Sequence, residues 1–175
     1  MPRVSLGLGS NKGLGTVDGR TIIAESALAL RERIANMRLS SLYISDPLYV
    51  VDQPLFINAA AVGDFEGSAY DLLAFINDIE ARFGRDRAIE RRRGERSLDI
   101  DILLYGDSVI ADGSKLTIPH EGLLERKFAL LPLLELSPDS IDPRDGKPLA
   151  DAYAALKSQG IYYADLPPYN NERRS

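Results

Sequence analysis

The stretch from Arg82 to Leu104, RFGRDRAIERRRGERSLDIDILL, turns from a basic run into an apolar run that two carboxylates interrupt. Up to Arg96 it holds seven arginines and three acids, in a chain whose formal net charge is -5. Residues two apart on a strand point to the same face, so Asp99 and Asp101 would lie side by side, roughly 6.5 Å apart along the strand. The pattern predicts a strand from Leu98 to Tyr105 with apolar side chains on one face and both carboxylates on the other.

Two interpretations of this stretch are open from spacing alone. Paired carboxylates can hold hard cations such as Mg²⁺ between them and an incoming phosphate, and arginines make forked contacts to phosphate oxygens. The stretch would then bind a metal-bound polyphosphate. The alternative is a solvated basic loop followed by an edge strand with protective charges, because charge runs are common on protein surfaces.

On both sides of this stretch, hydrophobic periodicity predicts the remaining elements. Strands are expected at 4–8, 38–44 and 56–65, edge pieces at 109–110 and 115–118, and helices at 21–35, 68–83, 129–136 and 149–156. The order β-α-β-β-α-β predicts an α+β fold with a ferredoxin-like core. Its antiparallel sheet would carry helices on one face, with edge strands and helices following at the C-terminal side and the other face left for a site. We expect one domain over 1–163 and a loose tail over 164–175.

Bulk composition excludes several classes of protein. The 175 residues, 45% of them hydrophobic and 27% charged, are typical of a single globular domain. The absence of cysteine excludes disulfides and thiolate metal sites. The N-terminus lacks the apolar core of a secretory signal, and no apolar run reaches membrane-spanning length. With a pI near 5.0, we expect a cytoplasmic protein without nucleic-acid or membrane partners.

Three further polar residues leave alternatives open. Asn58 lies in an otherwise apolar strand, as a satisfied core amide or as an amide that recognises a heterocycle. His120 lies in a predicted loop, where function is more frequent, although a lone histidine is more often structural. Glu80 ends a predicted helix as a solvated acid or as an acceptor for a nucleobase or an arginine. The glycines after the first strand fit neither a dinucleotide fingerprint nor a P-loop.

Four blocks in this order resemble 6-hydroxymethyl-7,8-dihydropterin pyrophosphokinases of folate biosynthesis. They are LGLGSN at 6–11, DQP and FINAA at 52–54 and 56–60, RRGERSLDIDIL at 92–103, and LTIPH at 116–120. The resemblance implies transfer of diphosphate from ATP to the hydroxymethyl group of the pterin, with release of AMP. It also implies a magnesium-dependent enzyme that holds two Mg²⁺ ions together with ATP, and we expect a monomer.

The resemblance further implies roles for individual residues. Metal ligands would be Asp99 and Asp101, and the catalytic group would comprise Arg85, Arg96, Asp99 and Asp101. ATP would contact Glu80, Arg87, Arg96, Ile102, Lys115, Thr117, His120 and Arg126. The pterin would contact Ser45, Asp46, Leu48, Phe56, Asn58, Asp99 and Phe128. Asp99 is in addition a candidate to help remove the proton of the hydroxymethyl group.

The chain departs from the family pattern at four positions. Arg93 stands where many members carry an aromatic residue, Lys115 where arginine is common, Glu121 where an aromatic is common, and Phe56 where tyrosine is found. These departures bear on affinity and on the choice of pterin. The alternatives are a diverged paralogue acting on another pterin, a non-catalytic pterin- or nucleotide-binding protein, and an RNA-binding ferredoxin-like module.

Overall fold

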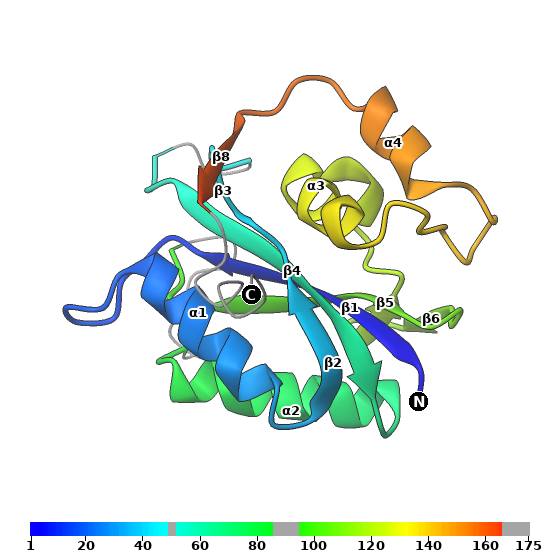
Figure 1. Ribbon diagram of the computed structural model, residues 1–175, viewed down its shortest axis with the longest axis horizontal. Helices are drawn as coiled ribbons and strands as arrows, with labels where there is room; N and C mark the ends of the chain where they lie inside the picture. Colours follow the sequence, from blue (N-terminus) through cyan, green and yellow to red (C-terminus); the bar gives the residue numbers. More distant parts are fainter. Residues whose placement is uncertain (49–51, 86–94, 166–175) are drawn as a thin grey trace, which may run out of the picture.

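A computed structural model describes residues 1–48, 52–85 and 95–165 (Figure 1). The strands are β1 Arg3–Ser10, β2 Ile34–Leu39, β3 Leu42–Ser45, β4 Phe56–Phe65, β5 Asp99–Tyr105, β6 Ile110–Asp112, β7 Leu116–Ile118 and β8 Ile161–Asp165. The helices are α1 Gly19–Leu30, α2 Ala69–Arg82, α3 Lys127–Leu136, α4 Leu149–Ala155 and a short 3-10 helix, Leu123–Glu125. Among the described residues, no helix combines the length and the apolar character needed to cross a membrane.

The main sheet is antiparallel, with strand order β5-β1-β4-β3-β8, and β2 also pairs with β4. β6 and β7 form a separate two-stranded sheet. Helices α1 and α2 cover one face of the main sheet, and α3, with α4 beyond it, covers part of the other (Figure 1). The predicted α+β fold with a βαββαβ core is confirmed. The second face is not left to loops alone, because α3 packs on Ala60 and Val62 of β4.

The sequence predicts the start of α2 better than it predicts the end of α1. Ser68 and Asp71 form a capping box at the start of α2, as their spacing predicts. The expected end of the first helix at residue 35 is wrong, since α1 stops at Leu30 and Ile34 already belongs to β2. Ile34 fits the apolar stripe of a helix and is buried as a strand residue instead, so periodicity alone could not place the boundary.

The predicted strand over 38–44 is two strands. Ser40 separates β2 from β3, with its backbone N–H donating to the carbonyl oxygen of Ala60 and its hydroxyl accepting from the N–H of Ala60. The side chain of Ser40 therefore takes part in the backbone pairing with β4 and interrupts the regular ladder. Both strands still pair with β4 on the same side.

β8 was not predicted from the sequence. It pairs antiparallel with β3 and adds a strand at that edge of the main sheet. The expected start of a tail at residue 164 falls inside β8, and residues 166–175 lie outside the described part of the chain. Tyr43 of β3 packs edge-to-face on Tyr163 of β8, with ring centroids 6.0 Å apart.

Candidate active site

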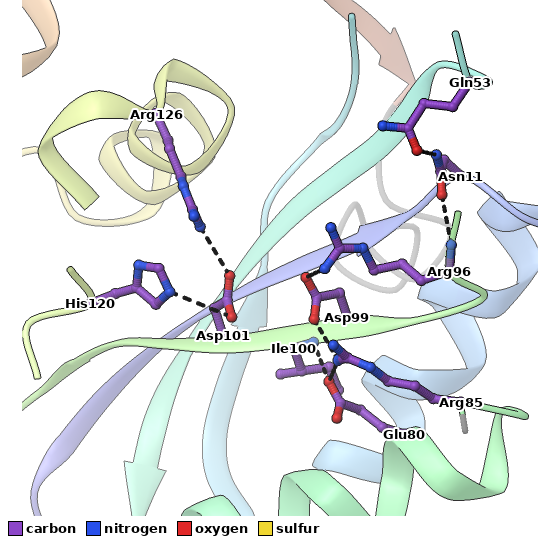
Figure 2. Close-up of polar contacts among 10 residues, drawn as sticks. All are labelled: Asn11, Gln53, Glu80, Arg85, Arg96, Asp99, Ile100, Asp101, His120 and Arg126. Atoms are coloured by element: carbon purple, nitrogen blue, oxygen red, sulfur yellow. Dashed lines mark hydrogen bonds and ion pairs between the residues drawn. The ribbon is translucent and has the colours of Figure 1, made fainter. Parts of the chain in front are cut away.

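The two carboxylates of β5 lie on the sheet face opposite α1 and α2. Ile100 and Ile102 between and after them point into the core beneath these helices, so Asp99 and Asp101 share the other side of the strand. Both remain partly accessible, with 19% and 34% of their side-chain area exposed. Figure 2 shows the pair with arginines approaching from both ends. This is the arrangement that residue spacing predicts.

Asp99 is held by two arginines from outside its own strand. Arg96 Nη1 lies 2.6 Å from Asp99 Oδ2, and Arg85 contacts the other carboxylate oxygen (Figure 2). Arg85 also contacts Glu80, which is buried at the end of α2 and accepts from the backbone N–H of Ile100 at 2.8 Å. Glu80 is therefore not a solvated acid: it ties α2 to β5 and orients Arg85.

Asp101 faces a second pair of groups. Arg126 Nη1 lies 3.4 Å from its Oδ2, and His120 Nε2 lies 3.6 Å from its Oδ1 (Figure 2). Partial burial raises the pKa of Asp101, and the neighbouring charge of Asp99 raises it further. Arg126 and Arg96 oppose this rise, so a cation close to Asp101 favours its charged form.

His120 is a neutral donor in this arrangement. The backbone N–H of Gly122 donates to His120 Nδ1 at 3.1 Å, which leaves the ring proton on Nε2, toward Asp101. Burial and then the nearby Arg126 lower the pKa of His120 to about 4. Near neutral pH the ring can therefore donate a hydrogen bond without adding positive charge.

Glycines of β1 form the floor between the carboxylates and Asn58. Gly9 pairs with Asp99 on one side and with Asn58 on the other, and Gly7 pairs with Asp101 and Ala60. A Cβ atom on Gly9 would meet only Asn58 Oδ1, at 3.7 Å. The sheet is therefore open above Gly9, and a flat ligand can approach its backbone closely.

Asn58 is nearly buried, with 4% of its surface exposed, and its amide nitrogen donates to Ser45 Oγ at 2.9 Å. Phe56 lies two residues before Asn58 on β4, with its ring centroid 5.8 Å from the guanidinium carbon of Arg96. Phe128, in the first turn of α3, is 5.9 Å from the guanidinium carbon of Arg126. Polar and aromatic groups from β3, β4 and α3 thus lie around the glycine floor.

Other predicted site residues lie farther out or in a different orientation. Asp46 and Leu48 are exposed in the loop after β3. Ile102 is buried in the core beneath α2, so any contact with a nucleotide would use its backbone. Lys115 lies over the ring of Tyr70, 5.0 Å from its centroid, and Thr117 is on β7. Arg87 and Arg93 lie outside the described residues.

Asn11 connects three loops, although the sequence singled it out only as part of a motif. Its amide nitrogen donates to Gln53 Oε1 and to the carbonyl of Pro54, and its Oδ1 accepts from the N–H of Arg96 at 2.9 Å (Figure 2). The N–H groups of Asn11 and Lys12 donate to the carbonyl of Arg96. Asn11 therefore holds the backbone from which Arg96 reaches Asp99. Residue type alone could not identify its partners, because they are 42 and 85 positions away.

Comparison with known proteins gives one consistent family. The sequence profile of 7,8-dihydro-6-hydroxymethylpterin-pyrophosphokinase (HPPK) matches residues 5–138. The chain is 41% identical over 162 residues to 2-amino-4-hydroxy-6-hydroxymethyldihydropteridine pyrophosphokinase of Pseudomonas aeruginosa, covering 91% of this chain and 94% of that protein. It is also 41% identical over 140 residues to folic acid synthesis protein fol1 of Schizosaccharomyces pombe, covering 78% of this chain. It spans only 19% of that longer relative.

Solved structures agree at the level of fold. A wild-type HPPK-DHPS chain of Plasmodium falciparum matches with a TM-score of 0.66 at 16% sequence identity. The match covers 87% of this chain and 43% of the Plasmodium chain. At this low identity the likeness supports the shared architecture of the main sheet and its helices.

Proposed function

Because the chain belongs to the 7,8-dihydro-6-hydroxymethylpterin-pyrophosphokinase family, we propose that it transfers diphosphate from ATP to the hydroxymethyl group of 6-hydroxymethyl-7,8-dihydropterin and releases AMP. The observation that carries this proposal is the acid pair on β5, set between Arg96 and Arg126 and continuous with the glycine floor below Asn58. Phosphates and a flat heterocycle can thus occupy neighbouring parts of one sheet face.

The donor set fits magnesium. Mg²⁺ commonly binds through one or two carboxylates and completes its coordination with substrate phosphates and water. Asp99 and Asp101 provide two carboxylates on one face, both partly accessible. We propose that they hold two Mg²⁺ ions brought with ATP, which would neutralise the charge that develops on the phosphate oxygens. No other protein ligand needs to be assigned.

The chain's own groups have three tasks in this reaction. Arg96 and Arg85 would exchange part of their contact with Asp99 for forked contacts to phosphate, since guanidinium groups match phosphate oxygens. Arg126 and the neutral His120 would contact the nucleotide beside Asp101. Asn58 would present its amide to the edge of the pterin, and Asp99 would help to accept the hydroxymethyl proton.

Glu80, Ile102, Lys115, Thr117 and Arg87 complete the proposed nucleotide site. Ser45, Asp46, Leu48, Phe56 and Phe128 complete the proposed pterin site. The departures from the family pattern would affect the affinity for ATP and for the pterin. Phe56 lies beside Arg96 and cannot donate from a hydroxyl, and Lys115 offers a point charge in place of an arginine fork. Glu121 is exposed next to His120.

A direct assay tests the reaction. Purified full-length chain is incubated with ATP, MgCl₂ and 6-hydroxymethyl-7,8-dihydropterin, and nucleotides and pterins are separated by chromatography. We expect AMP and pterin diphosphate in equal amounts, with no AMP when the pterin is omitted. Formation of ADP, or AMP release that does not depend on the pterin, would contradict the proposal.

Removal of metal is expected to stop turnover. An excess of EDTA over magnesium should abolish AMP formation, and added Mg²⁺ should restore it, because two carboxylates and several arginines alone cannot order a polyphosphate for in-line transfer. Asp101→Asn should shift the Mg²⁺ titration to higher concentrations. Full activity in EDTA would rule out magnesium dependence.

Filling the glycine floor should block the pterin. Gly9→Val places a β-branched side chain above the sheet between Asp99 and Asn58, where valine is compatible with a strand. We expect KM for the pterin to rise about tenfold or more, because the valine side chain would keep the pterin away from the sheet and remove at least one of its favourable contacts. Gly9→Ala, whose Cβ has room, is the graded control. Equal KM values in both variants and the wild type would exclude this floor as the pterin site.

A monomeric, cytoplasmic enzyme without nucleic-acid or membrane partners is part of the same proposal. Relatives differ in organisation, as they include a bifunctional folate synthesis protein of Arabidopsis thaliana named as mitochondrial. Size-exclusion chromatography with light scattering would test the oligomeric state, and a mass of twice 19.3 kDa would contradict the monomer.

A further inference from the structure

The chain returns to the candidate site after the region that the family profile matches. That match ends at residue 138, and α4 and β8 follow it. β8 lies along β3, the strand whose last residue, Ser45, contacts Asn58 (Figure 1). The two residues before β8, Gln159 and Gly160, therefore pass between the start of α3 and the loop after β3.

Gln159 completes the N-terminus of α3. Its Oε1 accepts from the backbone N–H of Lys127 at 2.9 Å, and its amide nitrogen donates to the carbonyl of Glu125 at 2.9 Å. The first N–H groups of a helix have no partner within the helix, and Arg126 at the cap position forms no side-chain cap. Gln159 supplies that acceptor from a distant segment. It thereby fixes the turn that carries Arg126 and Phe128.

Gly160 is bonded to the other neighbouring segment, the loop after β3. Its carbonyl accepts from the backbone N–H of Asp46 at 3.0 Å. A Cβ on Gly160 would overlap Asp46 Oδ2 and lie 2.7 Å from Asp46 Cγ. Any larger residue at position 160 must therefore displace the side chain of Asp46, or move the loop that carries it.

We propose that Gln159 and Gly160 are positioning residues that fix the gap between the two walls of the pterin pocket. This inference rests on the proposed function, in which Phe128 on α3 and Asp46 on the loop flank the pterin. Gln159 and Gly160 are consecutive, and each is hydrogen-bonded to a different wall, so the separation of the walls is set by one short spacer. A flat heterocycle needs a gap of fixed width for stacking and edge contacts.

The test measures pterin and nucleotide affinities separately. Wild type, Gly160→Ala and Gln159→Ala are titrated by calorimetry with a non-hydrolysable ATP analogue and Mg²⁺, and then, at saturating analogue, with 6-hydroxymethyl-7,8-dihydropterin. For Gly160→Ala we expect the Kd for the pterin to rise about tenfold, which is the loss expected for one hydrogen bond to the ligand. The Kd for the ATP analogue should stay within about twofold of the wild-type value. For Gln159→Ala we expect a similar rise in the Kd for the pterin. The Kd for the ATP analogue should rise less, because Arg126, which is proposed to contact the nucleotide, also lies at the start of α3.

Controls separate positioning from general destabilisation. Ser158→Ala changes an exposed neighbour on the same segment and should leave both affinities unchanged. Thermal unfolding reports the fold of each variant. Amide hydrogen exchange should accelerate at Lys127 in Gln159→Ala and at Asp46 in Gly160→Ala. If Gly160→Ala does not fold, Gln159→Ala alone carries the test, because it adds no bulk.

The outcomes distinguish this inference from the reaction itself. A folded Gly160→Ala or Gln159→Ala variant with wild-type pterin affinity overturns the positioning role and leaves the enzyme assignment intact. A wild type that binds the pterin without forming AMP overturns the reaction, and the variant affinities then decide the positioning role. A wild type that does not bind the pterin overturns both.

Discussion

Asp99→Asn is expected to lower kcat by about a hundredfold or more, which corresponds to roughly 2.7 kcal/mol of lost transition-state stabilisation. The amide keeps the shape of the side chain, but its single oxygen can accept from only one of the two arginines, Arg96 or Arg85, that contact the carboxylate. It removes the charge that is proposed to bind magnesium and the base that would receive the hydroxymethyl proton. Steady-state kinetics at saturating Mg²⁺ and both substrates measures the effect.

A matched charge change just beyond the strand controls for net charge. Asp107→Asn alters an exposed aspartate in the turn just beyond β5 and should keep wild-type kcat. A kcat near that of the wild type in Asp99→Asn would exclude Asp99 from proton removal and from metal binding. Loss of activity in Asp107→Asn to the same extent would show that overall charge, and not the site, is responsible.

Arg96→Ala should have the second large effect. Arg96 is held from both sides, by Asn11 through its backbone and by Asp99 through its guanidinium, so it is preorganised close to the proposed phosphates. Removal of one preorganised cation from a phosphoryl-transfer site typically costs about a hundredfold or more in kcat. We expect that loss in stopped assays of AMP formation.

Arg96→Lys is expected to recover only part of the rate, because an ammonium group cannot make the forked contact of a guanidinium. Arg82→Ala is the control, since Arg82 is half-exposed and pairs only loosely with Glu32, 3.6 Å away. A lysine variant as active as the wild type would show that Arg96 acts as a simple charge. An active alanine variant would remove Arg96 from the catalytic group.

Much of the fold could be predicted because its signals are local. Alternation in LDIDILL predicted β5 and the shared face of its acids, and the Ser68–Asp71 pair predicted the start of α2. The same local signals failed for Ile34, which suits a helix stripe and a strand equally well. β8 was missed because its residues show no alternation that contrasts with the polar tail after it, and its partner β3 is more than a hundred residues away.

For the candidate site, residue types were predictable and their partners were not. From the sequence, Asn58 could be a core amide or an amide that binds a ligand. In the structure it is nearly buried and donates a hydrogen bond to Ser45, on the sheet face that also carries Asp99 and Asp101. Glu80 was open between a solvated acid and an acceptor for a nucleobase or an arginine, and it contacts Arg85. Burial beside Arg126 keeps His120 neutral, and the position of Arg126 depends on the packing of α3 on the main sheet.

The amino-acid sequence by itself determined the two-residue period that sets Asp99 and Asp101 on one face and the helix cap that starts α2, because both depend on backbone geometry within a few residues. Only the tertiary structure decided that Asn11 holds Arg96, that Gln159 caps α3 and that Gly160 accepts a hydrogen bond from Asp46. Each of these contacts joins segments far apart in the chain. Such contacts form only when the packing of the whole sheet brings the segments together, and no local period encodes that packing.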